Sequence, residues 1–206
     1  GAATLTIVNS TIRKGATQGV SSSGCVLTLD SNIISQNTNE GINLSSTTYV
    51  LTNNIINTNG AGGFAGVNID TNSTGTFAFN TVASNGGANA FEGGVTCPSA
   101  GTAKVLQNSI IAQNSHNPMT GGTQFAGKCT LQSVVTGQDT FSGANQAVPA
   151  FTTDFHLDVS ATGLSANQTC CIDKIAIATT ANSGHDVDES SRPKGNGFDV
   201  GAHEAK

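Results

Sequence analysis

The sequence is poor in charge. Only 10% of its 206 residues are charged, and its 8 lysines and arginines are scattered among 13 acidic residues, which gives a net charge of −5. Binding to nucleic acids depends on clustered cations that neutralise phosphates, so we expect no nucleic-acid partner. No stretch approaches the roughly 20 apolar residues that a membrane-spanning helix needs, so we expect no membrane insertion. A signal segment is also missing at the start, which suggests a processed or trimmed product.

Motifs of common enzyme and metal-binding classes are missing as well. There is no GxSxG elbow, no HExxH zinc motif and no phosphate-binding loop. The five cysteines show no paired spacing typical of zinc or iron–sulfur sites. These cysteines are Cys25, Cys97, Cys129, Cys170 and Cys171.

We favour a disulfide between Cys97 and Cys129, which would imply an oxidising, extracellular setting. The alternative is that all five cysteines are buried free thiols. Adjacent Cys170 and Cys171 are poorly placed to bond to each other, so we expect one of them to bond elsewhere or to stay buried.

What the sequence does contain is a repeat. A seven-residue box recurs as NSTIRKG (9–15), SNIISQN (31–37), NNIINTN (53–59), FNTVASN (79–85), NSIIAQN (108–114) and, more weakly, QSVVTGQ (132–138). The boxes start 22, 22, 26, 29 and 24 residues apart. The fourth position is always β-branched and apolar: Ile12, Ile34, Ile56, Val82, Ile111 and Val135. Repeats of this length are typical of solenoids.

Each repeat offers about three short strands. A large apolar residue precedes five boxes, and a Gly followed by a β-branched residue comes after four of them, at Gly19-Val20, Gly41-Ile42, Gly66-Val67 and Gly94-Val95. No single repeat can bury its apolar face alone, whereas stacked repeats can. We therefore predict an all-β fold, a right-handed parallel β-helix of about six coils over residues 1–138. Residues 139–206 would be the closing coil and capping tail of the same domain.

The second position of the box is a small polar residue: Ser10, Asn32, Asn54, Asn80, Ser109 and Ser133. Stacked amides can hydrogen-bond from one coil to the next as a ladder. We interpret these asparagines as structural residues and not as ligands.

The turn before the Gly-Val step lengthens in successive coils. Its added residues are rich in Gly and contain Phe64, Phe91 and Phe125, with Glu92 and His116 nearby. Stacked at one corner, these loops would form an aromatic ledge that contacts a glycan. The alternative is that the phenylalanines fold inward over the loop backbone.

A polysaccharide-degrading enzyme of the pectate-lyase-like class is an alternative function. Glycoside hydrolysis needs two carboxyl groups roughly 5 to 9.5 Å apart. Within residues 1–135, Glu40 and Glu92 are the only plausible catalytic pair, as a loose pair two coils apart.

The tail carries a family resemblance. The segments AVPAFTTDFHLDVSATGL, CCIDKI and HDVDESSRPKGNGFDVGAHE resemble, in order, the ending of secreted bacterial right-handed parallel β-helix proteins of the choice-of-anchor type. Glu189 departs from the pattern, because the family often has Gly there. The resemblance covers about the last 60 residues and implies a β-helix fold and secretion, while the activities of the family are mostly unassigned.

The resemblance favours an end plate over an active site for the acidic tail. Charged residues there would cap the open end of the β-helix, which otherwise invites aggregation. The capping residues would be Asp186, Asp188, Arg192, Asp199 and Glu204. We expect no cofactor; the alternative is a calcium site built from Asp186, Asp188 and Ser190.

The first coil has no such cover, because Leu5, Ile7 and Ile12 begin the repeat directly. We expect this face to bind a second copy or an upstream domain, and the protein to be a secreted or cell-surface structural or adhesive module. A third class, ice binding, needs a regular threonine array. Thr6, Thr28 and Thr52 begin one, and Phe79 and Lys104 interrupt it.

Overall fold

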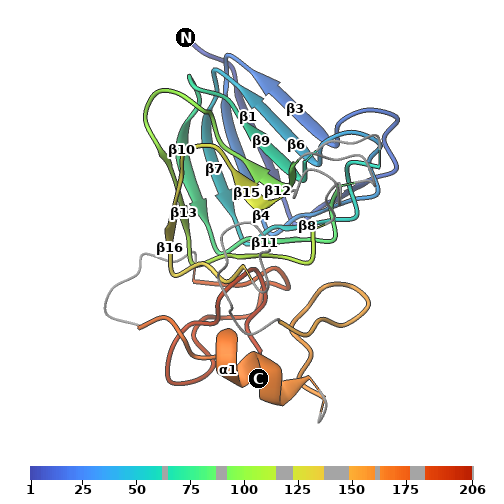
Figure 1. The fold of residues 1–206 in the computed structure, drawn as a ribbon, viewed down its shortest axis with the longest axis vertical. Coiled ribbons are helices and arrows are strands. Elements are labelled where there is room, and N and C mark those ends of the chain that lie inside the picture. Colours follow the sequence, from blue (N-terminus) through green and yellow to red (C-terminus); the bar gives the residue numbers. More distant parts are fainter. Residues whose placement is uncertain are drawn as a thin grey trace.

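The computed structural model is a parallel β-solenoid built from three sheets (Figure 1). It describes residues 1–61, 65–86, 92–114, 123–136, 149–160, 163–176 and 184–205. Sheet A contains, in spatial order, β1 (Thr4–Val8), β4 (Val26–Asp30), β7 (Thr48–Thr52), β10 (Thr74–Ala78), β13 (Lys104–Gln107) and β16 (Cys129–Gln132). Sheet B contains β2 (Thr11–Arg13), β5 (Ile33–Ser35), β8 (Ile55–Asn57), β11 (Thr81–Ala83) and β14 (Ile110–Ala112). Sheet C contains β3 (Val20–Ser23), β6 (Ile42–Ser45), β9 (Val67–Ile69), β12 (Glu92–Thr96) and β15 (Thr123–Ala126).

Equivalent positions of successive coils stack in register, as the repeat predicts. The fourth box residues pair in the order Ile12, Ile34, Ile56, Val82 and Ile111. The Gly-Val steps pair in the order Val20, Ile42, Val67 and Val95. These columns belong to one hydrophobic core, which also includes the large apolar residues before the boxes. The predicted all-β solenoid is confirmed.

The number of coils differs slightly from the expected six. Two sheets have five strands each, and only β16 and a short bridge continue beyond the fifth coil in the described residues. The sixth box was also misaligned by one residue, because Val135 pairs with Ile110 and not with Ile111. Val134 therefore packs against the core of the solenoid, while Val135 faces the tail.

Two amide ladders run between the coils. The predicted ladder connects Asn32, Asn54 and Asn80 through side-chain bonds of 3.0 Å each. A second ladder uses the seventh position of the box and runs through Asn37, Asn59, Asn85, Asn114 and Gln124, with side-chain bonds of 2.8 to 3.0 Å. The asparagines of both ladders are buried, so they hold corners of the solenoid and are not available as ligands.

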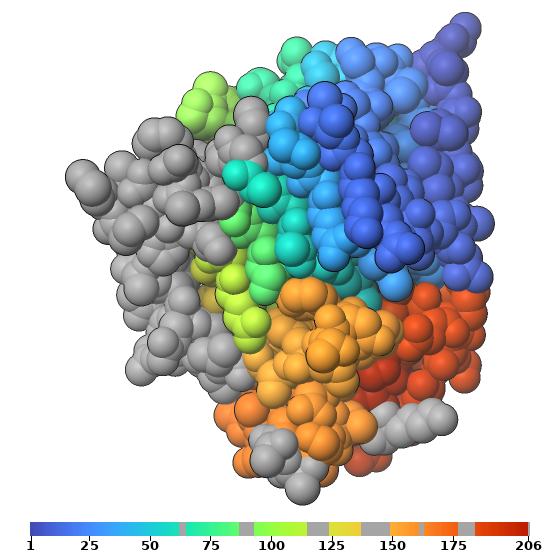
Figure 2. Space-filling view, turned by 90° about the vertical axis from the view of Figure 1, so that its right-hand side faces the viewer, coloured from blue at the N-terminus to red at the C-terminus, as the bar shows by residue number. Residues whose placement is uncertain are grey.

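The described residues of the tail lie along the side of the solenoid, against the outer face of sheet B. Figure 2 shows the coils in a row from the first to the last, with the tail packed beneath them and returning toward the first coil. It contains one short helix, α1 (Leu164–Cys170). The prediction of an end plate is corrected for the described tail residues, which cap the outer face of sheet B.

A column of apolar residues on the outer face of sheet B explains this position. Ile33, Ile55 and Ile110 precede the inward-facing residue of each strand, so their side chains point away from the solenoid core. Val187 and Phe198, among other apolar tail residues, pack against this column. Burying each such side chain contributes about 1.5 to 3 kcal/mol, which attaches the tail to the sheet.

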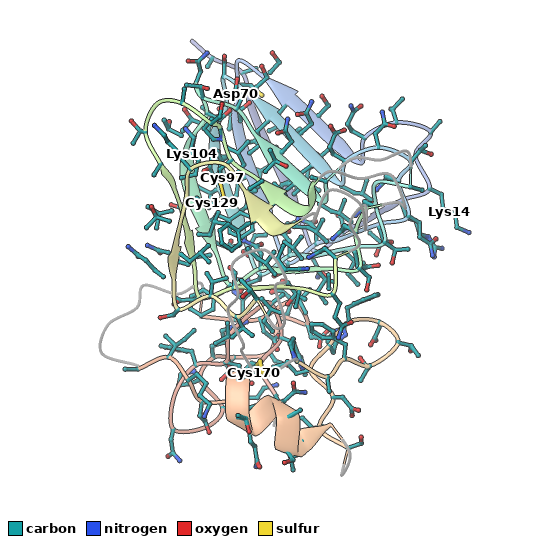
Figure 3. The ribbon with its side chains drawn as sticks, in the orientation of Figure 1. Lys14, Asp70, Cys97, Lys104, Cys129 and Cys170 are labelled. Atoms are coloured by element: carbon teal, nitrogen blue, oxygen red, sulfur yellow. A yellow bond between two sulfur atoms is a disulfide. The ribbon has the colours of Figure 1, made fainter. Side chains whose placement is uncertain are left out.

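The structure contains two disulfides. Cys97 and Cys129 bond across neighbouring coils, as expected, and lie on the solenoid in Figure 3. Cys170 and Cys171 bond to each other, which corrects the expectation that one of them bonds elsewhere, although Cys171 is fully buried. Cys25 is free and half-buried.

Candidate functional site

The candidate site is a tight turn in the tail, residues 185–191, with the groove beside it. The two ends of the turn pair as an antiparallel bridge. Oδ1 of Asp186 accepts the backbone N–H groups of Asp188 and Ser190 at 2.9 and 2.8 Å. A short acidic side chain that binds its own backbone in this way orders a turn. The side chains of Asp188 and Glu189 are left exposed.

Two histidines hold the carboxylate of Asp188. Nε2 of His156 lies 3.1 Å from Oδ1, and Nε2 of His203 lies 4.0 Å from Oδ2. The other ring nitrogen of His156 lies 3.1 Å from a carboxylate oxygen of Asp154. The two imidazole rings meet edge to face, with their centroids 4.8 Å apart. Asp188 is therefore oriented before any ligand arrives.

The ring of His203 is neutral near pH 7 and accepts one hydrogen bond. Burial lowers the pKa of its ring to about 4, and the charge on His156 acts in the same direction. Its Nδ1 accepts the backbone N–H of Leu157 at 3.2 Å. A neutral imidazole that accepts at one nitrogen carries its hydrogen on the other, so Nε2–H faces Asp188.

A metal ion fits this cluster poorly. Ligand atoms of Asp186, Asp188 and His203 lie within 4.8 Å of one another. However, the carboxylate of Asp186 accepts a third backbone N–H, from Glu204 at 3.0 Å, and Nε2 of His203 carries its hydrogen. The suggested calcium set of Asp186, Asp188 and Ser190 is likewise a hydrogen-bonded turn.

A groove of about 430 Å³ separates the turn from the first two coils. This volume lies within the range of about 300 to 1,000 Å³ that is usual for ligand sites. Hydroxyl, amide and carboxylate groups line it, together with two apolar side chains. The lining residues are Asn9, Ser10, Thr11, Ser31, Ile33, Val187, Asp188 and Glu189.

Buried charges rigidify the tail behind the turn. Arg192 binds Glu204 at 3.1 Å, and both side chains are almost fully buried. Burial lowers the pKa of Arg192, while the carboxylates of Glu204, Asp186 and Asp199 oppose this shift. The five predicted capping residues thus lie close together in the tail. Asp186 orders the turn and Asp188 is exposed on it, while Arg192, Asp199 and Glu204 hold the tail behind it.

Polar contacts fasten this tail to the solenoid. Nε2 of His185 lies 3.0 Å from Oδ2 of Asp30, and the Ser31 hydroxyl donates to the backbone oxygen of Asp186 at 3.1 Å. Further along, the N–H of Ala202 donates to the hydroxyl of Thr81 at 3.0 Å. The turn is therefore held against the first coils.

The predicted catalytic pair is not in register. Glu40 lies two residues before Ile42, whereas Glu92 lies three residues before its equivalent, Val95. Glu40 is buried and accepts a hydrogen bond from Gln18 at 3.2 Å. The side chain of Glu92 lies outside the described residues, so a catalytic role for this pair stays a prediction.

The predicted glycan ledge lies mostly outside the described residues. Phe64, Phe91 and His116 are not described, and neither is the side chain of Glu92. Phe125 is not in a loop: it lies in β15 and pairs with Val95, a core residue. This part of the ledge prediction is corrected.

The predicted assembly face is exposed. Each sheet ends at the first coil, where β1, β2 and β3 have a strand neighbour on one side only among the described residues. Leu5 is 47% exposed, although the equivalent Leu27 and Tyr49 are buried. Ile7 and Ile12 are half-buried and pack against the core.

Sequence reasoning missed the groove and the histidine cluster. His156 and His203 are 47 positions apart and share no motif, so only the folded tail brings them to Asp188. The apolar third position of the box was a usable signal for the tail contact.

No family model matches the chain, and neither a curated protein nor a solved structure matches it. Among the described residues, no helix is long and apolar enough to span a membrane.

Proposed function

We propose that this protein is a structural and adhesive β-solenoid module that acts outside the cell and assembles end to end through its first coil. The observation that carries the proposal is the row of three strand edges at that coil, where the side chain of Leu5 is exposed. The two disulfides support an oxidising location. We also assign the chain to the choice-of-anchor group of secreted bacterial β-helix proteins, on the motifs of its tail.

A second copy is the occupant that best fits the first coil. Ile7 in the first coil and Leu131 in β16 are the two ends of one column of core residues, and both side chains are half-buried. The first coil of one copy on the last coil of another would continue this column. Strand edges without charge or proline pair readily, and β1 has neither. Such a head-to-tail contact does not close on itself, so it builds filaments.

Light scattering after size exclusion, with negative-stain microscopy, tests this proposal. We expect oligomers that grow with protein concentration, and a monomer for Leu5→Asp. Val159→Asp is the matched control, because Val159 is similarly exposed, at 44%, but lies in the tail; it should assemble like the wild type. A wild-type chain that stays monomeric at all concentrations would contradict end-to-end assembly.

The groove favours glycan binding as a second candidate function. The carboxylates of Asp188 and Glu189 can accept hydrogen bonds from the hydroxyl groups of a sugar. Ile33 and Val187 offer an apolar surface for its C–H face. Thr11→Trp fills the groove from the exposed face of β2 and should abolish retention on a glycan array. Equal retention by wild type and Thr11→Trp would show that the groove is not the binding site.

A further inference from the structure

The outer faces of the three sheets differ in chemistry. Sheet B presents isoleucines, which the tail covers. Sheet C presents small polar residues, which in its first three coils are the unbranched Ser21, Asn43 and Asn68 and in the fourth is Thr96. Sheet A presents neither. Because strands of the same solenoid carry such different outer residues, the outer face of sheet A calls for an explanation beyond the preference of strands for β-branched residues.

Two columns of threonine and valine occupy two of the three outward positions of sheet A in the first four coils, and the third position contains Val8, Asp30, Thr52 and Ala78. One contains Thr4, Val26, Thr48 and Thr74, and the other contains Thr6, Thr28, Val50 and Thr76. Six of these eight residues are threonines, and valine has the same branched shape with a methyl group in place of the hydroxyl. All eight are exposed or half-buried. The four strands pair over all five residues without a shift in register.

The residues that the sequence analysis took to interrupt this array do not lie in it. Lys104 precedes Leu106 by two positions, and Leu106 pairs with Phe77 of the core. The buried ammonium group of Lys104 therefore points inward, where it donates to the backbone oxygens of Thr71 and Ser73. Phe79 is buried beneath the tail, against Phe198.

The backbone turns these columns into a regular lattice. Neighbouring strands lie about 4.8 Å apart, and alternate residues of one strand lie about 6.6 Å apart. Threonine and valine are stiff at χ1, so their hydroxyl and methyl groups repeat with the backbone. Charged side chains, which would disturb ordered water, are absent from both columns in these four coils. The oxygen rows on a prism face of hexagonal ice also repeat in two perpendicular directions, at intervals of the same order.

We propose that the outer face of sheet A binds ice, with the threonine hydroxyls as anchors in the lattice and the methyl groups between them ordering the intervening water. This surface is separate from the groove, and it shares only Thr4 and Thr6 with the first coil. The inference does not depend on the proposed function: a monomeric chain presents the same face.

Thermal hysteresis and the recrystallisation of ice in a frozen solution test this proposal directly. The wild-type chain should slow recrystallisation and shape ice crystals, and serum albumin at equal concentration should not. Thr48→Tyr, at the centre of the array, should reduce both activities to the albumin level. Thr48→Val, which keeps the branched shape, should retain most of the activity.

Ser21→Tyr is the matched control, because it places the same large side chain on the exposed outer face of sheet C. It should leave both activities unchanged, and circular dichroism should show that all variants remain folded. Wild-type activity no higher than that of albumin would overturn the proposal, and so would an equal loss in Ser21→Tyr and Thr48→Tyr. A concentration-dependent dimer that Thr48→Tyr abolishes would instead assign the face to a second copy of the chain.

Discussion

Asn59→Ala should be among the most destabilising single substitutions in the solenoid, because Asn59 is in the middle of the second amide ladder. Its Oδ1 accepts the backbone and side-chain N–H groups of Asn37 at 3.0 and 2.8 Å. Its Nδ2 donates to the backbone oxygen of Ile34 at 2.9 Å and to Oδ1 of Asn85 at 3.0 Å. Alanine removes all four bonds and leaves the buried donors of Asn37 without an acceptor.

The expected loss follows from these contacts. Each net hydrogen bond is worth about 1 kcal/mol, and an unpaired buried donor costs a further 1 to 3 kcal/mol or so, which together give about 4 kcal/mol or more. With a urea dependence of about 2 kcal/mol per molar, a loss of 4 kcal/mol lowers the unfolding midpoint by about 2 M. Asn59→Asp keeps the shape but removes the donors and buries a charge, so it should be at least as damaging at pH 7.

Urea unfolding followed by far-ultraviolet circular dichroism measures both variants. Asn72→Ala is the control, because Asn72 is exposed in a turn, and it should change the free energy of unfolding by no more than about 0.5 kcal/mol. If Asn59→Ala lowers the midpoint no further than Asn72→Ala does, the ladder does not stabilise the solenoid and the reasoning fails.

Three further predictions concern the tail and the disulfide. The ring of His203 should titrate near pH 4 by NMR; because it is neutral when folded, its contribution to stability is complete above about pH 6.5 and is lost as the pH falls toward 4, and a midpoint near 6.5 would contradict its burial. Arg192→Ala should lower the free energy of unfolding by about 3 to 5 kcal/mol, because it leaves buried carboxylates unpaired, whereas exposed Arg13→Ala should have little effect. Replacing Cys97 and Cys129 together by alanine should lower stability by about 4 kcal/mol, since the bond closes a loop across a sequence separation of 32; an unchanged unfolding midpoint would mean that the bond does not form.

Much of the solenoid was predictable because its information is local and repeated. The spacing of Ile12, Ile34 and Ile56 defines a column, and in-register stacking follows from the recurring box although the coils differ in length. The prediction failed where the repeat weakened: two adjacent valines at 134 and 135 fit the box equally well by hydrophobicity. Lys104 was wrongly placed on the outer face because charged side chains usually lie there. Its side chain is long enough to reach backbone oxygens inside the solenoid.

The candidate site was harder to predict because its members come together only through the tail. Asp188 was predicted to be a capping residue, but its partners His156 and His203 have no fixed spacing to it. The groove forms between the tail and the first two coils, and no sequence pattern connects its residues from the first two boxes with those from the tail. The ice-binding face was visible in part, as alternating threonines, yet only the strand register separates its two columns from the core.

By itself, the sequence determined the coil period, the core columns and the positions of the asparagine ladders, because stacked identical units make each residue meet its own equivalent. Only the tertiary structure decided that the tail lies along sheet B and not over an end. Hydrophobic burial has no direction, so the apolar residues of the tail suit either surface equally well. In the structure the described tail packs on the outward-facing Ile33, Ile55 and Ile110, and the groove and the histidine cluster follow from that contact.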